Sequence, residues 1–308
     1  MDPLVSVIIP NYNHAKFLKQ RIDSVLNQTY KNFEIIILDD KSIDNSIDII
    51  KQYEDNEHIA HVVINKENSG SPFKQWQKGF ELAKGDLIWI AESDDSCEES
   101  LLETLVTEFK NDQECVVAFC RSIKIDSEGQ KIGEIGMKND FHMEGMLFIK
   151  KYLYRYCFIT NASSAIFKKE ALKKTDLVFT TFKGSGDWLF WIEISKCGNV
   201  AYNNKALNHF RIHESNTTTQ ELNSGNNETE AIAIYHFMHK KKYIGYKELL
   251  RERIAHIYSI RYGKLHGYFK SEKKKELLKG WRESMYIRII VFGIFLAQSV
   301  FHVKIIKR

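Results

Sequence analysis

The chain has 308 residues, of which 44% are hydrophobic and 27% are charged. A chain of this length can bury a large apolar core without disulfide or metal cross-links, and its composition excludes a low-complexity disordered protein. The net charge of +4 is an average of two unlike regions. Residues 221–308 hold 18 Lys and Arg against 8 Asp and Glu, whereas residues 1–220 hold 26 against 32. The sequence therefore predicts an acidic body followed by a basic C-terminal region.

The first 120 residues alternate between two hydrophobic patterns. Short runs rich in Val and Ile are typical of buried strands, and apolar residues three and four positions apart are typical of helices. The expected strands are residues 5–9, 33–38, 61–64, 87–91 and 116–120, and the expected helices are 18–26, 43–50, 75–83 and 101–109. This alternation predicts an α/β fold with a mostly parallel sheet flanked by helices on both faces.

The pattern is less regular between residues 121 and 215. We expect a strand over 161–167, a helix over 168–174 and an apolar helix over 188–194. From about residue 228 onward the chain is helical in pattern and rich in Lys and Arg. The fold is therefore expected to carry a C-terminal helical extension.

The cysteines and the N-terminal segment indicate the cellular compartment in which the protein is expected. The five cysteines are an odd number and include no CxxC pair, which argues against a disulfide framework and a structural zinc site. The opening MDPLVSVIIP lacks the basic start of a secretory signal peptide. We therefore expect a reducing, cytoplasmic location.

Polar side chains follow three of the expected strands. Asn11 follows the first strand, Asp39 and Asp40 end the second, and Glu92-Ser93-Asp94-Asp95 follows the fourth. Ligands of open α/β sheets bind at the carboxyl ends of the strands, so these residues are expected to share a site. Three carboxylates within four residues suit Mg²⁺ or Mn²⁺ bound together with substrate phosphates. The alternative for each carboxylate group is a helix cap or a turn.

Two further residues are candidates for chemistry. Asp187 follows Gly-Ser-Gly at the start of an expected helix, where a carboxylate can serve as a general base or simply as a cap. His213 lies two residues after Arg211 and can be a metal ligand or a structural histidine. Neither a G-x-G-x-x-G fingerprint nor a Walker A loop occurs, so a nucleotide would be held through a cation and carboxylates.

Several segments in the correct order resemble family 2 glycosyltransferases, which have the GT-A fold. The resemblance spans about residues 4–215. Its segments are VSVIIPNYN (5–13), SVLNQTY (24–30), EIIILDD (34–40), NSG (68–70), and the DxD-type motif within IAESDD (90–95).

This resemblance implies a role for each matching residue. The nucleotide-sugar is expected to contact Pro10, Asn11, Tyr12, Asp40, Glu92 and Asp94. The metal ligands are expected to be Asp95, the preferred one, and His213, with Arg211 closing over the donor or the metal. Asp187 resembles the catalytic base.

Three positions depart from the family pattern. Glu92 stands where Asp is commoner, and Gly186 stands before Asp187 where Glu is frequent. Residues 71–76 stand where the family pattern has small residues and Arg. Whether Lys74 contacts the diphosphate in place of that Arg is left undecided by the sequence.

The resemblance implies an inverting, cation-dependent transfer of a sugar from a nucleotide-sugar, expected to be UDP-linked, to an acceptor hydroxyl. The expected acceptor is a saccharide or lipid-linked saccharide of bacterial surface polysaccharide, and the expected cation is Mn²⁺ or Mg²⁺. Residues 1–220 would form the catalytic domain, with a nucleotide-sugar half over about 1–120 and an acceptor half over about 121–220. The alternatives are a non-catalytic nucleotide-sugar-binding subunit and a nucleotidyltransferase.

Residues 221–308 lie mostly outside the resemblance. They contain the basic runs 240–242 and 273–275, and residues 289–303 carry no formal charge. This uncharged segment is shorter than the ~20 residues of a spanning helix. An apolar helix with basic flanks suits the inner face of the cell membrane, and packing on protein is the alternative. No nucleic-acid-binding motif is present, so no nucleic-acid partner is expected.

Overall fold

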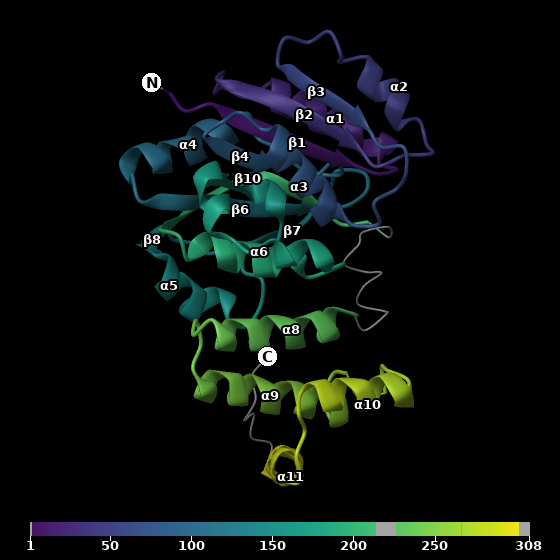
Figure 1. The fold of residues 1–308 in the computed structure, drawn as a ribbon, viewed down its shortest axis with the longest axis vertical. Helices are drawn as coiled ribbons and strands as arrows, with labels where there is room; N and C mark the ends of the chain where they lie inside the picture. The colour runs from purple at the N-terminus through teal and green to yellow at the C-terminus, as the bar shows by residue number, and fades with distance from the viewer. Residues whose placement is uncertain (1, 214–225, 266, 302–308) are drawn as a thin grey trace. The chain divides into compact units, whose positions relative to one another are not determined.

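The computed structural model describes residues 2–213, 226–265 and 267–301, and Figure 1 shows its fold. The chain divides into two compact units, residues 1–216 and 217–308. The first unit is a sheet with helices packed against it, and the described part of the second unit consists of helices.

Four strands of the first unit run parallel in the order β3-β2-β1-β4. These strands are β1 (Val5–Asn11), β2 (Phe33–Asp39), β3 (Ile59–Ile64) and β4 (Leu87–Ile90), and the chain passes between them through α1 (Ala15–Leu26), α2 (Ser46–Lys51) and α3 (Pro72–Leu82). Parallel strands need such crossover helices. The predicted α/β alternation is therefore confirmed.

The rest of the sheet is mixed. Its order continues β4-β9-β6-β10-β5, with β7 paired to β6 and β8 paired to β10. The strands are β5 (Ser96–Cys97), β6 (Cys115–Ile125), β7 (Lys131–Ile135), β8 (Phe141–Glu144), β9 (Ala165–Lys168) and β10 (Asn199–Arg211). Strand β9 is antiparallel to β4 and β6, whereas β10 is parallel to β6.

Both faces of the central strand β1 are covered. All of its residues are buried, and Val5, Val7 and Ile9 pack into one cluster with side chains of α1 and α4 (Leu101–Asn111). On the other face α3 approaches so closely that a Cβ at Gly79 would lie 2.5 Å from Cγ2 of Ile8. This double burial explains the continuous apolar run in the sequence.

Within the described residues of the first unit, the remaining helical segments lie between residues 145 and 195. They are α5 (Gly145–Phe148), the π-helical turn η1 (Ile149–Leu153), the 3₁₀ turns η2 (Ala162–Ser164), η3 (Lys169–Lys174) and η4 (Leu177–Thr181), and α6 (Gly186–Ser195). The helix predicted over 168–174 is therefore a 3₁₀ segment.

The second unit contains α8 (Asn226–Lys240), α9 (Tyr246–Arg261), α10 (Ser271–Gly280) and α11 (Met285–Phe301). The predicted C-terminal helices are thus present. Their shared core includes the fully buried side chains of Tyr235, Met238 and Trp281. Among the described residues, no helix is long and apolar enough to cross a membrane.

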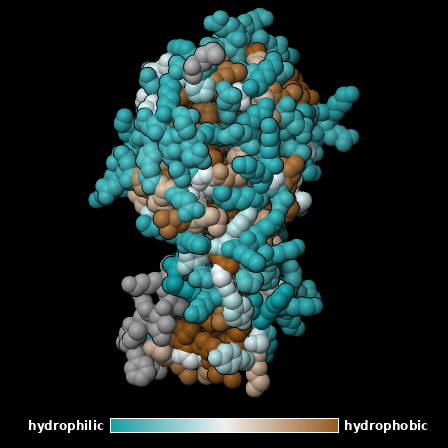
Figure 2. Space-filling model, turned by 60° about the vertical axis from the view of Figure 1, so that its left-hand side comes forward, coloured by the Kyte–Doolittle hydropathy of each residue, from teal (hydrophilic) through white to brown (hydrophobic). Residues whose placement is uncertain are grey.

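Helix α11 has two different faces. Ile287 and Val291 are buried, and Phe295 stacks on Tyr262 with the ring centroids 4.5 Å apart. The opposite face exposes a stripe of large apolar side chains, which we call the α11 stripe: Met285, Tyr286, Ile289, Phe292 and Leu296. Figure 2 shows apolar side chains gathered in this unit.

Candidate active site

The carboxyl ends of β1, β2 and β4 meet at one edge of the sheet. Asp40 N donates to Asn11 O at 2.8 Å, and Ala91 N donates to Ile8 O at 2.8 Å. Parallel register therefore brings the polar segments that follow these strands together, as ligand sites of α/β sheets require.

Asp40 organises the loop before α3. Its carboxylate accepts hydrogen bonds from Asn65 Nδ2 at 2.6 Å, from the backbone N and Oγ of Ser69 at 2.9 and 2.8 Å, and from Gln75 Nε2 at 2.9 Å. A carboxylate has about four lone-pair positions, so these donors fill it. Asp40, which the family resemblance predicts to contact the nucleobase, therefore holds this loop together and has little acceptor capacity left for a ligand.

Two amide oxygens near Asp40 are buried without a hydrogen-bond donor from the described residues: Asn11 Oδ1 and Gln75 Oε1. Asn11 is held through its Nδ2, which donates to Asp39 Oδ2 at 2.8 Å. Buried amide oxygens normally accept a hydrogen bond. These two atoms are therefore unsatisfied acceptors inside the buried network around Asp40.

The other predicted residues of β1 differ in accessibility. Pro10 is buried within the strand, where its backbone lies opposite Leu38 of β2. The Tyr12 ring beyond the strand end is 46% exposed. Tyr12 thus offers an aromatic face to a ligand, whereas Pro10 contributes through the path of the backbone.

Glu92 is tied to α3 and not to the cation candidates. Trp76 Nε1 donates to Glu92 Oε1 at 2.9 Å. Burial and the charge of Asp94 raise the pKa of Glu92 to about 8. The same Trp76 ring packs edge-on against Phe190 of α6, with the ring centroids 5.6 Å apart. Trp76 therefore links the DxD-type segment to α6.

Asp94 lies in a cluster with two histidines. His213 Nε2 is 2.9 Å from Asp94 Oδ2, and potential ligand atoms of His14, Asp94 and His213 all lie within 4.8 Å of one another. Burial opposes the charge of Asp94, but the hydrogen bond from His213 and the proximity of His14 outweigh it, so the pKa of Asp94 is lowered. Burial lowers the pKa of His14. One carboxylate and two imidazoles form a donor set that fits a divalent cation.

Asp95, the metal ligand preferred from sequence, occupies a different environment. Its side chain is fully buried, and its oxygens accept from Asn161 Nδ2 at 2.8 Å, Ser163 Oγ at 2.7 Å and the backbone N of Arg211 at 2.9 Å. Arg21 Nη2 lies 3.8 Å away. Burial and the adjacent Asp94 raise the pKa of Asp95. Asp95 therefore joins the ends of β4 and β10 to the segment before β9, and Asp94 faces the histidines.

Arg211 is a buried anchor. Its Nε donates to Asp94 O at 2.7 Å, its Nη1 to Asp126 O at 2.9 Å and its Nη2 to Gln20 Oε1 at 2.7 Å. Its guanidinium also lies over the Phe17 ring, 4.6 Å from the centroid. The family resemblance implies that Arg211 closes over the donor or the metal. In the structure its side chain fixes the backbone that presents Asp94.

Asp187 lies in the first turn of α6 in a half-buried position. Its Oδ1 accepts from the backbone N of Trp188 at 2.8 Å. Desolvation of the Cys157 thiol and, after it, the nearby Asp187 carboxylate raise the pKa of Cys157. A Cβ at Gly186 would lie 2.6 Å from Phe179 O and 2.6 Å from Cε2 of Phe73. This close packing explains why glycine stands where the family pattern often has Glu.

Lys74 donates to Ser69 O at 3.0 Å and is otherwise exposed. The Lys74 amino group therefore bonds to the same loop that the Asp40 carboxylate holds.

Sequence reasoning missed several residues of this site. Arg21 falls on the apolar stripe of α1 between Leu18 and Ile22, and a charge on a buried face signals a buried partner. His14 was visible in the loop after β1, but nothing local indicated its proximity to His213. No sequence pattern indicated that Asn161 and Ser163 would donate hydrogen bonds to Asp95.

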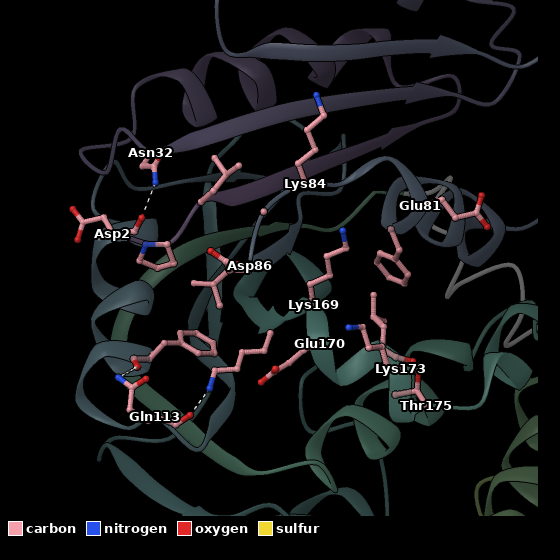
Figure 3. Close-up of a pocket in the computed structure, with 18 of the residues that line it drawn as sticks. Asp2, Asn32, Glu81, Lys84, Asp86, Gln113, Lys169, Glu170, Lys173 and Thr175 are labelled. Atoms are coloured by element: carbon pink, nitrogen blue, oxygen red, sulfur yellow. Dashed lines mark hydrogen bonds between the residues drawn. The ribbon is translucent and has the colours of Figure 1, made fainter.

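A cavity of about 1120 Å³ lies at the opposite edge of the sheet. It is lined by residues near the start of β1 and β4 and after β9, among them Lys84, Asp86, Lys169 and Lys173, as Figure 3 shows. Basic and acidic side chains are mixed along it, and it lies at the edge where the parallel strands begin. It is therefore separate from the candidate site.

The structure thus places a carboxylate–histidine cluster at the carboxyl ends of the strands, where open α/β sheets bind their ligands. The family model "Glycosyl transferase family 2" matches residues 6–175, more than half of the chain. The chain belongs to this family.

Curated relatives agree with this assignment. Glycosyltransferase GlyG of Streptococcus pneumoniae is 39% identical over 105 residues, which cover 34% of this chain and 35% of that protein. Chondroitin synthase of Pasteurella multocida is 26% identical over 227 residues, which cover 72% of this chain and 22% of that protein. The chain thus spans about a third or less of the length of these two relatives.

Solved structures share the GT-A fold. S. aureus TarS 1-349 in complex with UDP-GlcNAc aligns with a TM-score of 0.65 and 18% identity over 95% of this chain and 80% of that chain. Mannosyltransferase PcManGT from Pyrobaculum calidifontis, in complex with GDP-Man and Mn²⁺, aligns with a TM-score of 0.55 and 13% identity over 96% and 81% of the two chains. The predicted GT-A fold is therefore confirmed.

Proposed function

We propose that the protein is an inverting glycosyltransferase that moves a sugar from a nucleotide-sugar, most simply a UDP-sugar, to an acceptor hydroxyl. The observation that carries the proposal is the pairing of Asp94 with His213 at 2.9 Å, at the sheet edge that also presents Tyr12. Family membership and the UDP-GlcNAc bound by a fold neighbour support a nucleotide-sugar donor.

The base of the nucleotide would lie between Tyr12 and the loop shaped by Asp40. The exposed Tyr12 ring would stack on it. Asp40 would keep the loop in place through its hydrogen bonds from Ser69 and Gln75. The neighbouring Glu92, kept in position by Trp76, would contact the ribose.

Asp94 and His213 would hold the cation, with Asp94 in the role that sequence gave to Asp95. A bound divalent cation would neutralise the charge that develops on the departing nucleoside diphosphate. Arg211 would keep Asp94 in position because its side chain, at the end of β10, donates a hydrogen bond to the Asp94 carbonyl. The Mn²⁺ of PcManGT supports cation use in this fold.

Asp187 would remove the proton from the acceptor hydroxyl as it attacks the anomeric carbon. Its place at the start of α6 and its half-buried carboxylate suit a general base. Trp76 couples this helix to the donor side through its contacts with Phe190 and Glu92.

For the acceptor we propose a saccharide or lipid-linked saccharide of a surface polysaccharide, presented at the inner face of the membrane. A relative named for the synthesis of a polysaccharide, chondroitin, supports the acceptor class. The α11 stripe, in a region of net +10, suits an anionic leaflet, where each nearby Lys or Arg contributes about 1 kcal/mol.

The test is release of nucleoside diphosphate from a panel of UDP-, GDP- and dTDP-sugars, with Mn²⁺ or Mg²⁺ and with EDTA. We expect cation-dependent release from at least one UDP-sugar and a thermal shift with the same nucleotide. A thermal shift without any release would favour a non-catalytic binding subunit. Release of pyrophosphate from a nucleoside triphosphate and a sugar phosphate would favour a nucleotidyltransferase.

A further inference from the structure

We propose that His14 is a third ligand of the cation, so that the site is built from two imidazoles and one carboxylate and binds Mn²⁺ in preference to Mg²⁺. The inference rests on the proposed cation site of Asp94 and His213 and adds both a ligand and a metal preference to it.

The three side chains converge from separate parts of the chain. His14 precedes α1, Asp94 follows β4, and His213 follows β10. Their potential ligand atoms lie within 4.8 Å of one another. The His14 and His213 rings meet edge to face, with the centroids 5.5 Å apart. A single ion placed among them would be within reach of all three side chains.

The position of His14 is fixed, but its side chain does not serve the helix. His14 is the N-cap residue of α1, and its carbonyl accepts from Phe17 N and Leu18 N, each at 2.9 Å. N-caps favour Ser, Thr, Asp and Asn because their side chains bond to the first helical N–H groups. The His14 ring makes no such cap bond. The helix therefore does not explain a histidine at this position.

Two neighbours orient the histidines. Ser93 Oγ lies 2.9 Å from His14 Nδ1, and when Nδ1 donates to this hydroxyl, Nε2 keeps a lone pair for a metal. Phe17 packs against the His213 ring, with the centroids 5.1 Å apart. Histidine ligands in metal sites are usually held in this way, with one nitrogen bonded to an outer partner.

This donor set predicts the metal preference. Mg²⁺ favours carboxylate and phosphate oxygens and keeps most of its waters, whereas divalent transition metals, among which Mn²⁺ binds most weakly, also accept imidazole nitrogen. Replacing oxygen ligands by two imidazoles therefore disfavours Mg²⁺. The site should discriminate between Mn²⁺ and Mg²⁺ before any sugar is transferred.

The experiment is pulsed EPR of Mn²⁺ bound to the full chain, with and without UDP, which counts coordinated imidazole nitrogens. We expect two nitrogens in the wild type and one in His14→Gln. Titration followed by competition with Mg²⁺ then measures selectivity. His14→Asp, which supplies a carboxylate, should shift the competition toward Mg²⁺ by at least about tenfold. His61→Ala, on β3, is the matched control and should leave both readouts unchanged.

One coordinated nitrogen in the wild type would overturn the proposal even if every variant misfolded. An unchanged Mn²⁺ to Mg²⁺ ratio in a folded His14→Asp variant would also overturn it. These readouts involve no sugar transfer. A protein that binds Mn²⁺ through two imidazoles but releases no nucleotide would retain this inference and lose the proposed function.

Discussion

His213 Nε2 lies 2.9 Å from Asp94 Oδ2, although 119 residues separate them in the chain. The contact joins the end of β10 to the segment after β4. It exists because Arg211, at the end of β10, donates through its side chain to the Asp94 carbonyl and through its backbone N to the Asp95 carboxylate. Two adjacent aspartates thus have different surroundings, so substitutions of Asp94 and of Asp95 should have different effects.

Asp94→Asn should weaken Mn²⁺ binding by more than the about 10- to 100-fold that loss of an outer-shell partner costs, because it removes a charged ligand. The fold should be unaffected, since Asp94 makes its structural contacts through its carbonyl. Isothermal titration with Mn²⁺ and UDP measures the first effect, and thermal melting measures the second. Unchanged Mn²⁺ affinity would rule out Asp94 as a ligand.

Asp95→Ala should lower the free energy of unfolding by about 3–5 kcal/mol, because it leaves the buried Arg21 without its counter-charge and orphans the donors of Asn161 and Ser163. Urea unfolding measures this loss. If the variant instead keeps wild-type stability and loses only Mn²⁺ binding, Asp95 is a ligand, as the sequence alone suggested.

Strands β1 and β2 were predictable because both of their faces are buried, which leaves continuous Val and Ile runs over 5–9 and 33–38. Strand β10 was not predicted. Asn203, Asn204 and Lys205 interrupt its apolar pattern, and the register with β6 shifts there. Its stability comes from pairing with a distant strand, which no local pattern records.

The sequence predicted which segments form the site but not which side chains of those segments face one another. Local sequence placed carboxylates after β4, yet whether Asp94 or Asp95 turns inward depends on Asn161 and Arg211, which are 66 and 116 residues from Asp95. His14 was likewise visible only as a loop residue, since its partner lies at the far end of the first unit's sequence.

Asp187→Asn should reduce sugar transfer by about 100- to 10,000-fold, the usual contribution of a general base, and leave UDP binding unchanged. Transfer is followed by product release, and UDP binding by calorimetry. The exposed Asp48→Asn on α2 is the control. Near-normal transfer by Asp187→Asn would remove this residue from the mechanism.

Gly186→Ala should destabilise the protein by about 1–3 kcal/mol, because the added Cβ meets the Phe179 carbonyl and the Phe73 ring. Transfer should fall with it, since the start of α6 must move. Gly133→Ala, whose Cβ meets only Lys124 Cδ at 3.7 Å, is the matched control. Chemical denaturation measures the free energy of unfolding of both variants. Equal values would show that the start of α6 has room for a Cβ at position 186.

Replacing Ile289 and Phe292 of the α11 stripe by Gln should reduce recovery with anionic vesicles by at least about tenfold, because burial of such side chains contributes about 1.5–3 kcal/mol each. Ile43→Gln, at a position that is 87% exposed in the first unit, is the control. Flotation with phosphatidylglycerol and with neutral vesicles measures the effect. Equal recovery of all three proteins would favour packing on protein as the role of the stripe.

The central claim is that the cation site lies at Asp94 and His213. A crystal structure with UDP and Mn²⁺, with data collected at the manganese absorption edge, locates the ion directly. We predict an anomalous peak within coordination distance of the Asp94 carboxylate and His213 Nε2, with Asp95 still bonded to Asn161 and Ser163. A peak on the Asp95 carboxylate, or at a site away from both aspartates, would contradict the account.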